Sequence, residues 1–168
     1  MKKYFLLLVC FLGVLTAHAQ ENTEQVTTYY LIRHAEKQRT NPNDKDPNLT
    51  FKGLKRADKW AEVLSEANIN RVYTTNYNRT KETALPTAQK NGLKLYVYNP
   101  ANMYNDGFKF NTKGKNVLIV GHSNTTPKFV NTILGKNQYQ PIKDSNNSNL
   151  YIVTVTEKGA TATLLKID

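Results

Sequence analysis

Two short apolar runs in this chain each end in a histidine, and this feature constrains the fold more than any other. The run 29–32 is followed directly by Arg33 and His34, and the run 117–120 is followed by a glycine and then His122. Charge-free runs rich in β-branched and aromatic residues predict buried strands. Since open α/β sheets bind ligands at the carboxyl ends of their strands, the pattern predicts a site at that edge of a sheet.

Strand and helix patterns alternate along the rest of the chain. Helices are predicted from the N-cap Thr50 to Leu64, from the region of Arg79 to Lys90, and from Thr125 to Leu134. The buried face of the first helix is expected to consist of Leu54, Ala57, Trp60 or Ala61, and Leu64. Between them, strands are predicted at 26–32, 71–75, 93–98 and 116–120, and a β-hairpin at 150–156 and 160–167. Strand, helix and strand in succession indicate parallel pairing with right-handed crossovers. The segment 99–115 is ambiguous, with a short helix as one interpretation.

The first residues have the pattern of a secretory signal peptide. Two lysines precede the apolar stretch 4–15, and Ala17-His18-Ala19 resembles a cleavage site. We therefore expect a signal peptide at 1–19, a single mature domain at 20–168, and export to the periplasm or outside the cell. The apolar stretch is too short to span a bilayer, so no membrane span is expected after removal of the signal. Cys10 would leave with the signal, so the mature chain would have neither a disulfide nor a thiol nucleophile.

The charge of the chain favours an anionic partner. The formal net charge is +10, and it stays strongly positive without the two lysines of the signal. The lysines are scattered, and neither a run of five basic residues nor a nucleic-acid-binding motif is present. An anionic partner could be a small phosphorylated or carboxylated substrate or a polyanion, and no nucleic-acid partner is expected. The scattered lysines fit a solvated, generally basic surface best. Arg79 supports an anionic partner, because a cation is unfavourable in the first turn of a helix unless an anion lies in front of it.

Four ordered motifs resemble those of the histidine phosphatase superfamily, which has the phosphoglycerate mutase-like fold. They are Arg33-His34-Ala35-Glu36, Leu49-Thr50-x-x-Gly53-x-x-Arg56-Ala57, Tyr73-Thr74-Thr75 with Arg79-Thr80-x-x-Thr83-Ala84, and Val120-Gly121-His122-Ser123. The resemblance covers nearly all of the mature chain. It implies a three-layer α/β/α sandwich around a mostly parallel sheet, a phosphohistidine intermediate, and no metal or other cofactor. By position, His34 matches the nucleophile, Arg33 and Arg79 the phosphate-binding arginines, and His122 the second histidine of the pocket.

The chemistry of these residues fits those roles. A neutral imidazole can attack phosphorus, and the guanidiniums of Arg33 and Arg79 would oppose protonation of His34. The two arginines and His122 would stabilise the charge of the transferring phosphoryl group. The hydroxyl groups of Thr74 and Ser123 could add contacts to the substrate, although ordinary loop roles fit them equally well.

The proton donor for the leaving group is less well defined. Asp106 is the best candidate by position, although an aspartate before glycine is common in turns. Glu36 and Glu82 are alternatives that fit better as partners of arginines. Some compact members that resemble phosphohistidine phosphatases lack this acid.

Two other functions remain open from the sequence. The motif Gly121-His122-Ser123-Asn124-Thr125 partly resembles the nucleophile turn of α/β-hydrolases but lacks its closing glycine. The chain could also be a non-catalytic exported module that binds phosphate or a polyanion. The lack of an insertion over the pocket favours a phosphatase over a mutase, since an open pocket admits water.

Overall fold

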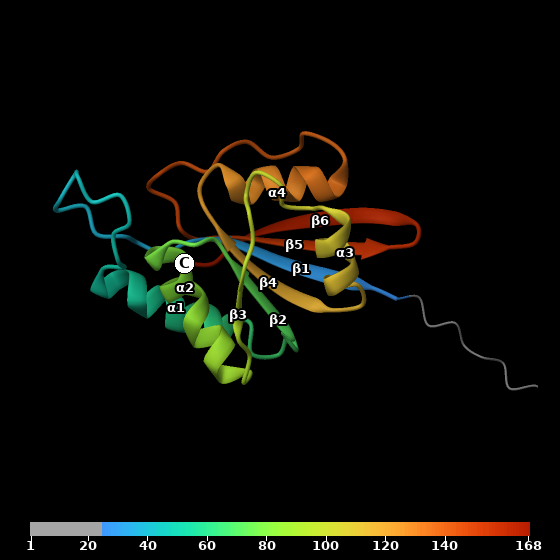
Figure 1. The fold of residues 1–168 in the computed structure, drawn as a ribbon, viewed down its shortest axis with the longest axis horizontal. Coiled ribbons are helices and arrows are strands. Elements are labelled where there is room, and N and C mark those ends of the chain that lie inside the picture. The colour runs from blue at the N-terminus through green and yellow to red at the C-terminus, as the bar shows by residue number, and fades with distance from the viewer. Residues whose placement is uncertain (1–24) are drawn as a thin grey trace, which may run out of the picture.

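The computed structural model describes residues 25–168, and the predicted signal peptide lies outside the described residues. A six-stranded sheet with the order β3-β2-β4-β1-β5-β6 forms the centre of the fold (Figure 1). Its strands are β1 (Thr27–Arg33), β2 (Arg71–Thr74), β3 (Leu95–Val97), β4 (Asn116–Gly121), β5 (Asn149–Thr156) and β6 (Gly159–Lys166). The first four are mutually parallel, and β5 and β6 form an antiparallel hairpin at one edge. The predicted strands, and the hairpin at the sheet edge, are confirmed.

Helices cover both faces of the sheet, which confirms the expected three-layer α/β/α architecture (Figure 1). They are α1 (Phe51–Val63), α2 (Asn78–Lys90), α3 (Asp106–Thr112) and α4 (Thr125–Leu134). Helices α1 and α2 share a hydrophobic cluster with Leu118 and Val120 of β4, whereas α3 and α4 share one with Val117 and Ile119. Successive residues of β4 thus enter opposite cores, which explains why this run is apolar throughout.

Helix α1 begins at its predicted cap but has a slightly different buried face. The Thr50 hydroxyl accepts a hydrogen bond from the Gly53 amide at 3.0 Å, as expected of an N-cap. Ala57, Trp60 and Leu64 are buried as predicted, whereas Leu54 is 46% exposed. The prediction for Leu54 was wrong because Gly53, not Leu54, is the residue of the first turn that faces the protein interior.

Gly53 lies directly against the segment that follows His34. A Cβ atom added to Gly53 would lie 2.3 Å from the Glu36 carbonyl oxygen, a backbone atom with little freedom to move. We expect Gly53→Ala to lower the free energy of unfolding by about 1–3 kcal/mol through overpacking. At an exposed helical site, the same change would instead be stabilising by about 1 kcal/mol. Urea denaturation checks this, with the exposed Glu62→Ala of the same helix as control. Equal or higher stability of Gly53→Ala would contradict the close packing.

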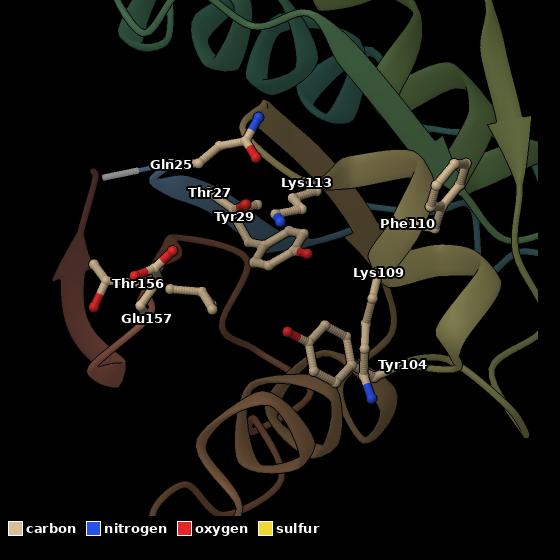
Figure 2. Close-up of a pocket in the computed structure, with 10 residues that line it drawn as sticks. Gln25, Thr27, Tyr29, Tyr104, Lys109, Phe110, Lys113, Thr156 and Glu157 are labelled. Atoms are coloured by element: carbon tan, nitrogen blue, oxygen red, sulfur yellow. The ribbon is translucent and has the colours of Figure 1, made fainter. Parts of the chain in front are cut away.

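The ambiguous segment contains a short helix, α3, and borders a hollow at the amino end of β1. Phe108 of α3 is buried, whereas Phe110 is 83% exposed. The hollow is about 300 Å³ in volume, and Figure 2 shows Tyr29 and Tyr104 along it, with Glu157 of the hairpin turn also at its wall. It contains no histidine and lies at the end of β1 opposite to Arg33.

In the described part of the chain, no helix is both long and apolar enough to cross a membrane.

Candidate active site

Sheet pairing brings the two histidines together. His34 directly follows β1 and His122 directly follows β4, and these strands are parallel neighbours in which Arg33 pairs with Gly121. The His34 amide donates a hydrogen bond to the Gly121 carbonyl at 2.9 Å, which extends the pairing past the end of β1. The centroids of the two imidazole rings are 5.5 Å apart. The predicted meeting of the two strand ends is therefore present in the fold.

The imidazole ring of His34 is held in one orientation by the backbone of the next residue, Ala35. Its Nδ1 lies 2.7 Å from the Ala35 carbonyl oxygen, and since a carbonyl only accepts, Nδ1 carries the proton of the neutral ring. The Asn147 side chain donates to the His34 carbonyl at 2.8 Å, and the Thr83 hydroxyl accepts from the Ala35 amide at 2.9 Å. This arrangement leaves the lone pair of Nε2 available for attack on an electrophile.

His34 remains neutral well below neutral pH. The side chain is 4% exposed. Burial lowers its pKa to about 3, and the nearby charges of Arg33, His122 and Arg79 act in the same direction. A neutral imidazole is the nucleophilic form, so the environment of His34 suits an attacking group.

His122 is fixed by a threonine that follows β2. Its Nε2 lies 2.9 Å from the Thr75 hydroxyl, and its ring is nearly perpendicular to the Tyr77 ring with 5.2 Å between centroids. Burial lowers the pKa of His122 to about 4, and the positive charges of Arg79 and Arg33 contribute. Thr74 and Ser123 were the two hydroxyl groups considered for substrate contacts. The Thr74 side chain is fully buried, and its hydroxyl donates to the Thr75 carbonyl. The backbone carbonyl of Ser123 accepts a hydrogen bond from the Ile142 amide. Thr75, rather than Thr74, is the hydroxyl that contacts the pocket histidine.

Arg33 is buried and anchored by the loop before β5. It is 3% exposed, and its Nη1 donates to the carbonyls of Lys143, Asp144 and Asn146 at 2.8–3.0 Å. Its Nη2 lies 2.5 Å from the Asp144 carboxylate. Its Nε is buried without a hydrogen-bond partner within the described chain. The guanidinium is thus held in place with one donor left unused.

Arg79 lies in the first turn of α2 and has more unused donors. Its side chain is 12% exposed and lies over the Tyr77 ring, 4.3 Å from the centroid. Its Nη1 is 3.5 Å from an Asp46 carboxylate oxygen, but neither Nη1 nor Nε makes a hydrogen bond within residues 25–168. Buried donors without partners are costly, so a bound anion would stabilise this arrangement. Asp46 also accepts the Asn78 amide at 2.8 Å, which holds the loop after His34 against the first turn of α2.

The three candidate acids do not lie free beside His34. Asp106 has a fully exposed side chain that pairs with Lys109 of its own helix at 3.2 Å. Glu36 pairs with Arg56 at 2.9 Å, and Glu82 accepts the Leu49 amide at 2.6 Å. Glu36 does bind an arginine as predicted, whereas Glu82 binds backbone instead. Elsewhere in residues 25–168, no group of three or more potential ligands lies close enough to hold a metal.

A cleft of about 200 Å³ opens beside Arg33 and His34. Lys37, Arg39, Lys52, Asp144 and Asn147 also line it. None of these five was a candidate from the sequence. Lys37 and Arg39 lie in the loop that follows His34, whereas Asp144 and Asn147 come from a polar loop with no recognisable motif.

The two lowered histidine pKa values predict a loss of stability in acid. The unfolded chain takes up protons on both histidines near pH 6.5, while the folded chain resists protonation until about pH 4 and about pH 3. The unfolded state then binds more protons, so the free energy of unfolding should fall as the pH decreases from 6.5 towards 4. Between pH 7 and pH 5, each histidine lowers the free energy of unfolding by at most about 2 kcal/mol.

Urea denaturation at pH 7 and pH 5 tests this expectation. The loss of stability between the two values should be smaller in His34→Gln than in the wild type, because glutamine does not titrate. An equal loss in both proteins would contradict the lowered pKa, because it would mean that His34 takes up its proton as readily in the folded state as in the unfolded state.

Comparisons with known proteins agree with the geometry. A model of the histidine phosphatase superfamily, branch 1, matches residues 29–99. The comparison with curated proteins found no significant match.

Solved structures with this fold include three phosphatases. The protein histidine phosphatase SixA in complex with tungstate has a TM-score of 0.66 at 16% identity, with 83% of this chain and 96% of that chain covered. A histidine-to-alanine variant of phosphoserine phosphatase from Entamoeba histolytica, in complex with phosphoserine, has a TM-score of 0.64 at 13% identity, with 82% and 95% covered. The mycobacterial glucosyl-3-phosphoglycerate phosphatase has a TM-score of 0.59 at 12% identity, with 84% and 98% covered. At these identities the structures establish the fold, while the family match covers β1, β2 and the motifs between them. Residues 29–99 therefore match the histidine phosphatase superfamily, and the chain has the fold of the phosphatases compared above.

Proposed function

We propose that this protein is an exported phosphatase that hydrolyses a phosphomonoester or a phosphoramidate through a phosphohistidine on His34. The observation that supports this best is the orientation of His34, whose Nδ1–H donates to the Ala35 carbonyl while Nε2 stays free beside Arg33, Arg79 and His122. Tungstate in SixA and phosphoserine in the phosphoserine phosphatase are consistent with an oxyanion bound in this fold.

The reaction takes place in two displacements. In the first, the Nε2 lone pair of His34 forms a bond to phosphorus, and the bond from phosphorus to the leaving group breaks with its electron pair on that group. In the second, water attacks phosphorus and the P–N bond breaks, which releases phosphate, a proton and the neutral imidazole. The Ala35 carbonyl stabilises the positive charge of the phosphorylated ring through Nδ1–H. Unused donors of Arg33 and Arg79 would bind the equatorial oxygens in both steps.

The leaving group is expected to need little help from an acid. Glu36 and Asp144, the carboxylates that line the cleft, are each paired with an arginine, and the arginines lower their pKa values. Such groups stay ionised and donate protons poorly. This favours substrates with good leaving groups, such as aryl phosphates or the imidazole of a phosphohistidine peptide.

A turnover assay tests the function. The mature chain should release phosphate from 4-nitrophenyl phosphate or from a phosphohistidine peptide without added metal. Phosphate binding without any turnover would instead indicate a non-catalytic binding module. Export is tested separately: the protein recovered from the periplasm or medium should begin at Gln20, and an intact Met1 in the cytoplasm would contradict it.

A further inference from the structure

The cleft beside His34 has more positive charge than one phosphoryl group needs. Four cationic side chains line it, and two of them, Lys37 and Arg39, follow the nucleophile closely in the chain. Arg33 is one of the two arginines assigned above to the phosphoryl group. Two of the other three charges are paired with carboxylates of the protein.

The two carboxylates of the cleft are both engaged. Asp144 bridges Arg33 at 2.5 Å and Arg39 at 2.7 Å, so a single carboxylate serves two guanidiniums. Glu36 binds Arg56 at 2.9 Å, outside the cleft, and lies 3.7 Å from the exposed Lys52. Neither carboxylate is within ion-pair distance of Lys37.

Lys37 is the cation of this cleft that has no ion-pair partner in the described chain. Among residues 25–168, no carboxylate pairs with its ammonium group. Partial burial lowers its pKa, and the positive charges of Arg79 and Arg39 lower it further, while the negative charge of Asp144 only partly opposes them. A lysine in such surroundings is stabilised when an anion binds between it and the neighbouring guanidiniums.

We propose that Lys37, assisted by Arg39, binds a second anionic group of the substrate. The preferred substrates are then phosphorylated molecules that carry a carboxylate or another phosphate close to the phosphoryl group that is removed. This inference rests on the proposed phosphatase function, because it assigns His34 and the two arginines to that phosphoryl group. It makes Lys37 a specificity-determining residue of the same site.

Two aryl phosphates of nearly the same shape test the inference. 4-Carboxyphenyl phosphate has the second anionic group, and 4-carbamoylphenyl phosphate has a neutral amide in its place. We expect the ratio of their kcat/KM values, carboxylate over amide, to fall on the order of fivefold in Lys37→Gln relative to the wild type, as for a partly exposed ion pair. The comparison of ratios cancels the difference between the two leaving groups. The exposed Lys128→Gln should leave the ratio unchanged. A ratio that is the same in Lys37→Gln and wild type would overturn the inference.

A binding measurement separates this inference from the proposed function. Calorimetry with His34→Ala, which lacks the nucleophile, should show tighter binding of the carboxylate compound than of the amide, and His34→Ala with Lys37→Gln should lose the difference. If the wild type hydrolyses neither compound but the binding difference is present, the phosphatase proposal fails and the second anion site stands. If both compounds are hydrolysed but bind equally well to His34→Ala, the second anion site fails alone.

Discussion

His34→Ala should reduce the turnover of any accepted substrate by at least about a thousandfold, because it removes the atom that forms the bond to phosphorus. In the wild type, Nε2 is free and Nδ1 is fixed on the Ala35 carbonyl. Alanine offers no other nucleophile at this position, and the mature chain would contain no cysteine. Steady-state assays with 4-nitrophenyl phosphate measure the effect, and circular dichroism confirms that the variant is folded.

Trapping the intermediate identifies the nucleophile directly. Wild-type protein quenched in base during turnover should carry a phosphoryl group that is lost in acid, and peptide mass spectrometry should place it on His34. His122→Ala serves as the matched control, since it removes the neighbouring imidazole but should still form the adduct, at a lower rate. A phosphoryl group on Ser123, or one retained in His34→Ala, would refute the mechanism.

The parts of the site that follow strands could be predicted from the sequence. The apolar runs of β1 and β4 are local signals, and two parallel neighbours place their carboxyl ends at the same edge of the sheet. The location of His34 and His122 follows from this rule, whereas their roles were expected from the resemblance to the histidine phosphatases. Arg79 was found because a cation in a first helical turn conflicts with the helix dipole.

The contacts that orient these residues could not be predicted in the same way. Asp144 and Asn147 lie more than 100 positions from Arg33 and His34, in a polar loop whose sequence is typical of any surface connection. Their roles depend on how that loop returns to the sheet before β5, which no local pattern encodes. The same reason explains the choice between threonines. Thr74 and Thr75 look equivalent in the sequence, and only the end of β2 decides that Thr75 faces His122.

Arg79→Lys is expected to lower kcat/KM by about a hundredfold, and Arg79→Ala by more. The guanidinium is held over the Tyr77 ring at 4.3 Å, and its Nε and Nη1 have no hydrogen-bond partner in the described chain. A planar guanidinium can direct donors on more than one edge at the oxygens of a phosphoryl group, whereas one ammonium group cannot reproduce that geometry. The same variant should also weaken inhibition by inorganic phosphate, which competes for these donors. Most of the loss should appear in kcat, because charge on the oxygens increases in the transition state.

Arg71→Lys is the matched control for this change. Arg71 also lies over a tyrosine ring, that of Tyr96, at 5.3 Å, but it is at the amino end of β2, away from His34. It should therefore keep wild-type kcat/KM and wild-type inhibition by phosphate. If Arg79→Lys kept more than half of the activity, or if both variants lost activity equally, Arg79 would be only a structural cation. Its unused donors would then need another explanation, since a buried guanidinium without partners destabilises the fold unless something binds to it.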